Sequence, residues 1–268
     1  MKTLTTFPRI SEFEKAVEIL KTGKYPYLEI HPYPYYSKVG VSSLATTLEG
    51  RSAIQENQTV ITSGWIDYRP IESQIPKNKP NDFAEDLFGN AAIMVLSVCV
   101  ADENKIRLIA HISGNLSPAF PYMNSEMPQA AFNIDGPTFF YMDQYRMITL
   151  YSNRIAVAKA DDLLDGWRIL EKIRCTANEI WARRSMITPS SELRKKPPAL
   201  EIYFRLPRTN CRQCEEKTCM ALALKLWTGN AQPGACKPIF TGEYQHLKDA
   251  FLQVCHGLGY FAGDSTDD

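Results

Sequence analysis

Four of the seven cysteines in this chain lie close together near its C-terminal end. Their spacing is C-x2-C-x4-C-x16-C, and they are Cys211, Cys214, Cys219 and Cys236. The C-x2-C pair can reach one metal centre from a single turn, the third cysteine follows a few residues later, and the fourth comes from a distant segment. A [4Fe–4S] cubane needs this arrangement, because each of its four irons takes one thiolate. The spacing therefore predicts that these four cysteines bind a [4Fe–4S] cluster.

A structural zinc site with four thiolate ligands is the alternative. Such sites usually pair two short C-x2-C knuckles, whereas sixteen residues separate Cys219 from Cys236. The spacing therefore favours a cluster over zinc. An odd number of cysteines with one tight cluster also argues for metal binding rather than a disulfide framework. Cys99 and Cys175 are most simply thiols of the core.

The residues after Cys219 support an anionic centre. A strongly helical run over residues 220–227 stops at Gly229, and Thr218 is a candidate cap at its start. The beginning of a helix presents free N–H groups and the positive end of the helix dipole, both of which stabilise an anion such as an all-thiolate cluster. Pro238 would stiffen the chain beyond the last cysteine. Further positive charge comes from Arg208, Arg212, Lys217 and Lys237.

The segment carries a longer pattern than the cysteines alone. Besides the first three cysteines and Cys236, the pattern includes Leu206, Pro207, Thr209, Asn210, Thr218, Ala221, Ala223, Lys225, Leu226 and Gly229. This pattern resembles the small iron–sulfur domain of the corrinoid iron–sulfur protein large subunit, a module that also occurs in related acetyl-CoA pathway proteins. The resemblance covers only Leu206–Ile239. It implies a [4Fe–4S] cluster that passes single electrons, in that family to an oxidised cobalt corrinoid.

The chain departs from the family pattern at two places. The family usually has glycine next to its second cysteine, where this chain has Glu215, and the family's C-P-P is here Cys236-Lys237-Pro238. Neither change removes a ligand, but both would affect the potential or exposure of a cluster. The chain has no D-x-H-x-x-G corrinoid motif, so the resemblance does not extend to corrinoid binding.

The N-terminal part mixes hairpin patterns with helices at either end, which indicates an α+β fold rather than a doubly wound parallel sheet. One segment, Val39–Leu48, is compatible with either a strand or a helix. The remaining pattern predicts a short helix over Ser11–Lys21 that Ser11 could cap, an irregular or edge segment over Tyr25–Tyr36, strands over Thr59–Tyr68, Thr138–Tyr141, Met147–Tyr151 and Ile155–Ala158, a hairpin of Ala92–Val100 with Lys105–Ile112, a loop over Gly114–Pro128, and helices over Asp161–Arg184 and Glu243–Leu258.

A polar segment, Ile187–Pro198, breaks the helical pattern with the basic run Arg194–Lys196 and two consecutive prolines. We therefore expect three parts. Residues 1–187 would form an α+β domain with an antiparallel sheet and flanking helices, of unknown role. Residues 188–198 would form a linker, and residues 199–268 a small, mostly helical, [4Fe–4S] domain that ends in a helix and a frayed tail at Asp264–Asp268.

The composition of the chain limits the classes of partner that we expect. Thirty basic residues balance thirty acidic ones, so no global field favours nucleic acid or a membrane surface. The first nine residues lack the features of a signal peptide, and the longest apolar run, Ala91–Ala101, is too short to cross a bilayer. We expect a cytoplasmic protein without nucleic-acid or membrane partners. Its oligomeric state stays open.

Three functions are compatible with these features. The first is a non-enzymatic redox protein of anaerobic metabolism that transfers one electron to or from a partner redox protein or corrinoid protein. The second is a metallocofactor or iron–sulfur cluster assembly or delivery protein that holds its cluster transiently. The third is an enzyme whose active site lies in the N-terminal domain, with the cluster as an accessory. A deep polar pocket near His31 or His111 would favour it, but residues 1–190 contain no catalytic constellation that can be named.

Overall fold

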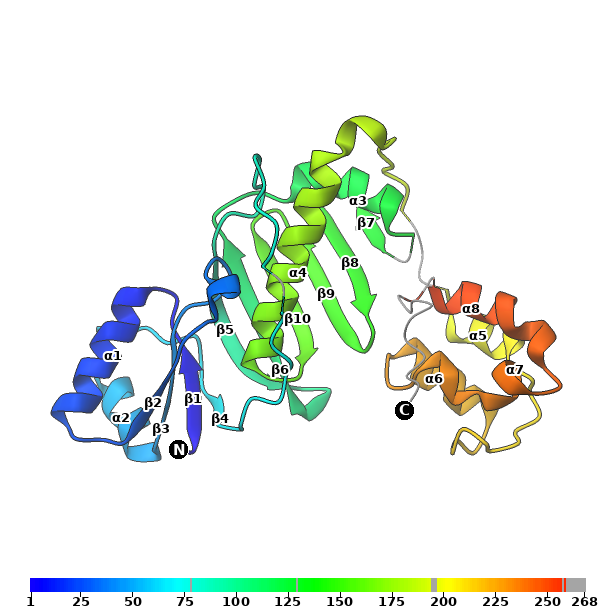
Figure 1. The fold of residues 1–268 in the computed structure, drawn as a ribbon. Helices are drawn as coiled ribbons and strands as arrows, with labels where there is room; N and C mark the ends of the chain where they lie inside the picture. The colour runs from blue at the N-terminus through cyan, green and yellow to red at the C-terminus, as the bar shows by residue number, and fades with distance from the viewer. Residues whose placement is uncertain (78, 129, 194–196, 257, 259–268) are drawn as a thin grey trace. The chain divides into compact units, whose positions relative to one another are not determined.

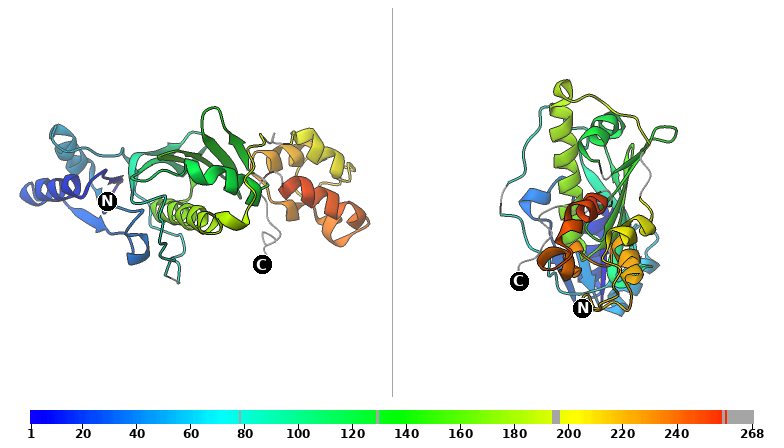
Figure 2. Two further views of the ribbon diagram at one scale, coloured as in Figure 1. Left: turned by 90° about the horizontal axis from the view of Figure 1, so that it is seen from above. Right: turned by 90° about the vertical axis from the view of Figure 1, so that its right-hand side faces the viewer.

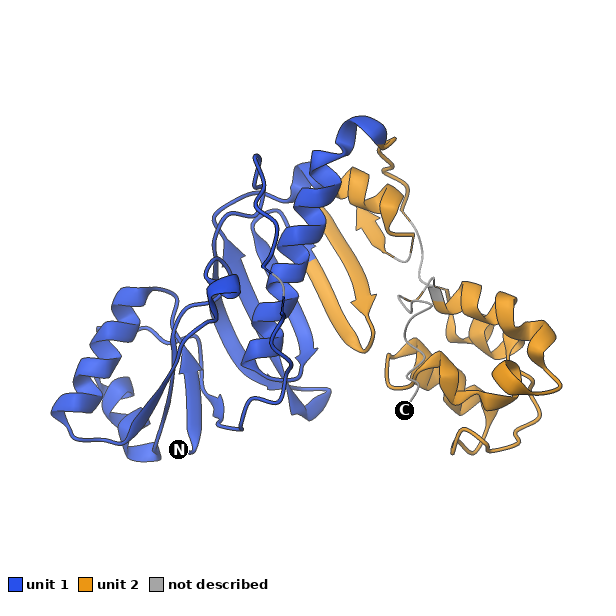
Figure 3. Cartoon of the chain, viewed as in Figure 1, with its two compact units in different colours: residues 1–119, 150–186 blue, residues 120–149, 187–268 orange. Residues whose placement is uncertain are grey.

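The computed structural model divides into two compact units, each of which is considered by itself (Figure 3). The first unit contains residues 1–119 and 150–186, and the second contains residues 120–149 and 187–268. The predicted basic run Arg194–Lys196 and the predicted tail Asp264–Asp268 lie outside the described part of the chain. The structure describes residues 1–77, 79–128, 130–193, 197–256 and 258.

A four-stranded antiparallel sheet begins the first unit, with strand order β2-β3-β1-β4. The apolar side chains Phe13, Ala16, Val17 and Leu20 recur at helical spacing, so α1 presents one apolar face. This face packs with Leu44 and the side chains around it in a separate small core. The elements are β1 (Thr3–Thr6), α1 (Ile10–Thr22), β2 (Tyr27–Ile30), the 3₁₀ helix η1 (Pro34–Tyr36), β3 (Ser43–Thr46), α2 (Leu48–Glu56) and β4 (Ile66–Asp67).

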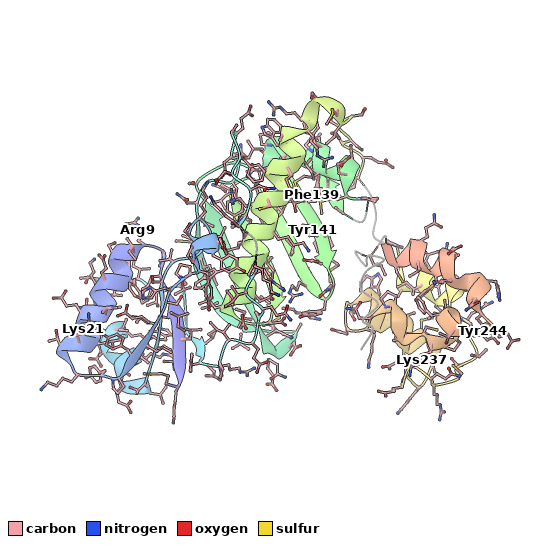
Figure 4. All side chains as sticks on the ribbon, viewed as in Figure 1. Arg9, Lys21, Phe139, Tyr141, Lys237 and Tyr244 are labelled. Carbon is pink, nitrogen blue, oxygen red and sulfur yellow. The ribbon has the colours of Figure 1, made fainter. Side chains whose placement is uncertain are left out.

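A six-stranded sheet has the order β5-β6-β10-β9-β8-β7 (Figure 1). The predicted hairpin is confirmed, because β5 and β6 pair antiparallel with Ala92 opposite His111. Phe139 and Tyr141 lie on β8 (Figure 4), where the Phe139 ring stacks on Phe120. The strands are β5 (Ala91–Cys99), β6 (Asp102–Ile112), β7 (Ala131–Asn133), β8 (Thr138–Asp143), β9 (Arg146–Tyr151) and β10 (Arg154–Ala160).

The long helix α4 (Leu163–Ala182) lies along one face of β5, β6 and β10 (Figure 2). The Asp162 side chain caps it by accepting a hydrogen bond from the Asp165 N–H at 2.8 Å. A Cβ atom at Gly166 would lie 2.6 Å from the Leu108 side chain on β6, so glycine allows a close approach between helix and sheet. Trp167, the next residue, is fully buried.

A buried ionic network ties α4 to the loop before β5. The Arg174 guanidinium, 3% exposed, donates to Glu171 Oε1 at 2.8 Å and to Asp86 Oδ2 at 3.1 Å. Asp86 also accepts hydrogen bonds from the Asn178 amide at 2.7 Å and from Lys38 Nζ at 3.1 Å. Each buried charge therefore has charged and neutral partners, as burial requires.

Three local expectations are wrong in part. The predicted strand Thr59–Tyr68 is reduced to β4, because Gly64 has φ +127° and interrupts the extended run, so that only residues after it form a strand. The predicted loop Gly114–Pro128 contains the 3₁₀ helix η2 (Ser117–Ala119) and the helix α3 (Phe120–Glu126), because proline is tolerated in the first turn of a helix. Arg9, not Ser11, occupies the capping position of α1, and its side chain makes no cap hydrogen bond.

The C-terminal region is helical, and the α+β prediction is confirmed. The last helix begins at Lys248 rather than at the predicted Glu243, after a short 3₁₀ turn. Within the described residues, no helix combines the length and the apolarity needed to span a membrane. The elements are η3 (Arg184–Met186), α5 (Ala199–Arg205), α6 (Cys219–Trp227), η4 (Pro233–Ala235), α7 (Lys237–Thr241), η5 (Gln245–Leu247) and α8 (Lys248–His256).

Candidate metal centre

Helix α6 places Cys219 in its first turn. The Thr218 hydroxyl caps this helix by accepting a hydrogen bond from the Ala221 N–H at 3.1 Å, which confirms the predicted cap. At the other end Gly229 has φ +75°, and the Asn230 N–H donates to the Lys225 carbonyl at 2.7 Å. This is the Schellman arrangement that ends many helices at glycine. Both ends of α6 are therefore determined by local sequence.

The loop that precedes α6 has an unusual backbone. Four residues between positions 208 and 215 have positive φ: Arg208 at 60°, Asn210 at 52°, Arg212 at 62° and Glu215 at 66°. Such angles cost roughly 1–2 kcal/mol per non-glycine residue. Alternation of left- and right-handed residues turns successive N–H groups toward one side and makes concavities that hold anions, including iron–sulfur clusters. Glu215 stands where the resembling family has glycine. Its positive φ explains why glycine suits this position.

Asn210 fastens this loop to the helix. Its side-chain oxygen accepts a hydrogen bond from the Cys219 N–H at 2.8 Å. The sequence pattern includes Asn210 without assigning it this role. Asparagine is enriched several-fold among non-glycine residues with positive φ, so its place just before Cys211 could have suggested a turn.

The four cysteines predicted as ligands line one small cavity. They differ in exposure: Cys211 is exposed, Cys214 is half-buried, and Cys219 and Cys236 are 7% and 4% exposed. Metal bound in this cavity would therefore have a dry side and a side open to solvent at Cys211. The other lining residues are Pro207, Thr209, Asn210, Arg212, Glu216, Thr218, Leu222 and Pro238.

The donor set of this cavity is rich in thiols. Its single carboxylate, that of Glu216, forms an ion pair with Lys225. Burial raises the pKa of the Cys236 thiol to about 12, against a hydrogen bond from the Ile239 N–H, and the three neighbouring cysteines raise it further. Without bound metal the Cys236 thiol is therefore protonated at neutral pH, and iron must displace that proton on binding. Soft thiolates suit an iron–sulfur cluster, so the residues present fit this group.

The described side chains do not form a group of three or more His, Cys, Asp or Glu that could hold a single metal ion. A cubane distributes its four thiolates over four irons, so its ligands stand further apart than those of one tetrahedral ion.

Two of the cysteines also belong to the hydrophobic core of the C-terminal region. Cys219 and Cys236 pack with residues from all four helices, α5 to α8. Two of the four candidate ligands are therefore also part of this core. The core residues are Ile202, Leu206, Cys219, Leu222, Ala223, Leu226, Cys236, Ile239, Phe251, Val254, Cys255 and Leu258.

The other three cysteines do not line this cavity. Cys99 is buried on β5. Cys175 on α4 donates to Glu171 at 3.4 Å, and burial raises its pKa to about 11. Cys255 on α8 is fully buried, and burial raises its pKa to about 12.

The two histidines considered for a catalytic site have ordinary surroundings. His31 Nδ1 lies 2.8 Å from the Ser42 hydroxyl, and its Nε2 lies 3.2 Å from Glu29. His111 is exposed on β6, opposite Arg154 on β10. Neither lines the cysteine cavity.

Comparison with known proteins finds the same segment. Residues 206–238 match the family described as "Putative Fe-S cluster". The acetyl-CoA decarbonylase/synthase complex subunit gamma of Methanocaldococcus jannaschii is 35% identical over 60 residues, which is 22% of this chain and 12% of that protein. Subunit gamma 2 of the same complex from Methanosarcina thermophila is 50% identical over 40 residues, 15% of this chain and 8% of that protein.

These matches support an iron–sulfur segment in the C-terminal region and an iron–sulfur cofactor. They cover about a tenth of the length of the two curated relatives. No solved structure matches the chain.

Proposed function

We propose that this protein holds one [4Fe–4S] cluster through Cys211, Cys214, Cys219 and Cys236 and transfers single electrons to or from a partner protein. The observation that carries the proposal is the convergence of these four thiols on one cavity, with Cys211 at the solvent side. A ligand at the surface gives an electron a short path to a partner. The family match at residues 206–238 supports the choice of an iron–sulfur group.

The cluster, when bound, supplies a one-electron couple. The chain contributes its surroundings. The four thiolates bind, the Asn210–Cys219 hydrogen bond orients the first turn of α6, and the core around Cys219 and Cys236 excludes water. The N-terminal end of α6 and the loop N–H groups favour the negative charge of an all-thiolate cluster. Oxidation and reduction then need little rearrangement of the protein.

We also propose that residues 199–268 are a cluster-binding domain, joined through residues 188–198 to a domain formed by residues 1–187. The support is that one hydrophobic core gathers buried residues that lie only between Ile202 and Leu258, within the described chain. A region with its own core can fold as a unit.

The partner we propose is a redox protein, with a corrinoid protein as one candidate. The two relatives are named as subunits of an acetyl-CoA decarbonylase/synthase complex, which is an assembly of several proteins. An electron carrier in such surroundings would meet its partner by direct docking.

The proposal is tested by purifying the full chain without oxygen and measuring iron, sulfide and zinc, with EPR spectra before and after dithionite. We expect about four irons and four sulfides per chain and a paramagnetic signal after reduction. Cys219→Ala should abolish that signal, while the matched variant Cys255→Ala, outside the cavity, should keep it. Zinc without sulfide would contradict the proposal.

A delivery protein is the second candidate, and the exposure of Cys211 favours it, because an exposed ligand can be exchanged. Incubating the loaded protein with an apo-ferredoxin distinguishes the two functions. Cluster transfer within minutes would support delivery, whereas a cluster that stays in place through repeated reduction and oxidation supports electron transfer.

A further inference from the structure

We propose that the surface around Cys211 is a docking site for an electron-transfer protein with acidic residues around its own redox centre. The inference rests on the proposed function and adds the chemistry of the partner. Four exposed basic residues, which we call the basic rim, form this surface: Arg208, Arg212, Lys217 and Lys237.

The cations of the basic rim are available to a partner. None of the four takes part in a salt bridge among the residues that the structure describes. Two other cations of the same region are already engaged, since Lys225 pairs with Glu216 and Arg205 pairs with Glu201. Between Arg208 and Thr218 the acidic residues are Glu215, which is exposed, and Glu216, which is half-buried. The loop therefore presents an excess of unpaired positive charge.

The basic rim follows the mouth of the cysteine cavity. Arg212 lines the cavity itself. Arg208, Lys217 and Lys237 each stand between two residues that line it, in the sequence order of the loop and of the segment around Cys236. Lys237 is at the beginning of α7 (Figure 4). The rim residues therefore belong to the segments that form the cavity, one of which carries the exposed Cys211.

The exposure of these charges favours a role in docking over a role in setting the reduction potential of the cluster. Exposed charges are strongly screened by water and salt, so they act weakly on a centre whose ligands Cys219 and Cys236 are buried. The same charges can orient an approaching protein and raise its association rate, by about ten-fold to a thousand-fold in favourable cases. The chain as a whole carries no net charge, so this attraction is local to the rim.

Two haem proteins of opposite charge provide the test. The full-length loaded protein is reduced with dithionite, freed of excess reductant, and mixed in a stopped-flow instrument with cytochrome b5, which is acidic, or with cytochrome c, which is basic. The reduced cluster gives one electron to the ferric haem of either protein. Each rate constant is measured from low to high salt. The slope of the rate constant against salt concentration reports the sign of the charge at the docking surface, independently of the driving force of electron transfer.

We expect oxidation by cytochrome b5 to slow by roughly ten-fold or more as salt rises, and oxidation by cytochrome c to be unchanged or faster. The double variant Lys217→Glu/Lys237→Glu, at two exposed rim residues that do not line the cavity, should lose the cytochrome b5 slope while keeping its iron, sulfide and reduction potential. The control variant Lys21→Glu/Lys24→Glu changes the net charge equally at two exposed lysines of the first unit and should keep the slope.

Three outcomes would overturn the inference. They are a cytochrome b5 rate that is independent of salt, a slope that survives in the rim variant, and a rim variant whose potential shifts while its salt dependence does not. A protein without iron and sulfide would overturn the proposed function as well, and metal analysis shows this before any kinetics. A loaded cluster without salt dependence would overturn the docking surface alone.

Discussion

The region around α4 and the region around α6 differ in what their buried charged groups and thiols bind. Around α4 the chain itself supplies the partners of the charged groups, because Arg174 donates hydrogen bonds to Glu171 and Asp86 and neutralises their charge. Around α6 the buried thiols Cys219 and Cys236 lie in the core beside a strained loop. The charges of the first region are paired within the chain, whereas in our proposal the thiols of the second region need a bound cluster. The two should therefore respond differently to metal and to mutation.

Removal of the metal should have the largest effect and should be confined to the second region. Stripping the iron with an oxidant and a chelator leaves four thiols in place of iron–thiolate bonds, and a small core whose folding is coupled to metal loses most of its stability. We expect fast hydrogen exchange over residues 199–256 and unchanged protection over residues 1–119 and 150–186. Equal protection of both regions after iron removal would show that the C-terminal core is self-sufficient.

Arg174→Ala should have the converse effect. It leaves the buried carboxylate of Glu171 without its cation and the half-buried carboxylate of Asp86 with Lys38 alone. Loss of one partner of a buried pair typically costs about 3–5 kcal/mol. We expect denaturant unfolding followed by tryptophan fluorescence to show this loss while iron and sulfide content is maintained. Arg9→Ala removes an exposed arginine and is the control; we expect little change in its free energy of unfolding.

The pH dependence of stability should report the ionic network around α4. Burial alone would raise the pKa of Asp86, but hydrogen bonds from the Gly89 N–H, Asn178 and Lys38 outweigh it and lower that pKa to about 2. Because the folded pKa lies below the unfolded value, the ionised carboxylate stabilises the fold above about pH 4. This contribution is lost as the pH falls through about 2. Asp86→Asn should flatten the acid limb of the stability profile, and an unchanged limb would contradict this.

Asn210 should contribute a smaller and local stabilisation. Asn210→Gly removes the hydrogen bond to the Cys219 N–H but suits the positive φ, so it should cost about 1 kcal/mol. Asn210→Ala also adds backbone strain, so it should cost more. Denaturant titration of the cluster absorbance gives both values. A cost for glycine as large as that for alanine would show that backbone strain at this position is negligible.

Glu215→Gly should change the stability least and in the favourable direction. At φ +66° glycine relieves a strain of roughly 1 kcal/mol, partly offset by the larger entropy of an unfolded glycine. We expect the cluster to bleach at a higher denaturant concentration. Gln213→Gly, at an exposed loop position without positive φ, should lower stability instead, and an equal response of both variants would contradict the backbone explanation.

Local sequence predicts much of both regions. The hairpin of β5 and β6, the cap of α4 at Asp162 and the cap of α6 at Thr218 follow from side-chain alternation and capping chemistry, which act within a few residues. The predicted strand over Thr59–Tyr68 is largely wrong, because Gly64 adopts a positive φ where it contacts the Leu96 carbonyl. A contact between distant segments decided that conformation, and no local pattern reports it.

The same division applies to the candidate site. The sequence by itself determined the identity and spacing of four thiols, and a helix that begins at Cys219 and is terminated by Gly229, just beyond its last residue Trp227. Only the tertiary structure decided that Cys236 is buried while Cys211 is exposed, and that Asn210 bonds to the first turn of α6. The reason is physical: capping and periodicity are short-range properties of the chain. Burial and the approach of distant thiols depend on how helices α5 to α8 pack around one core.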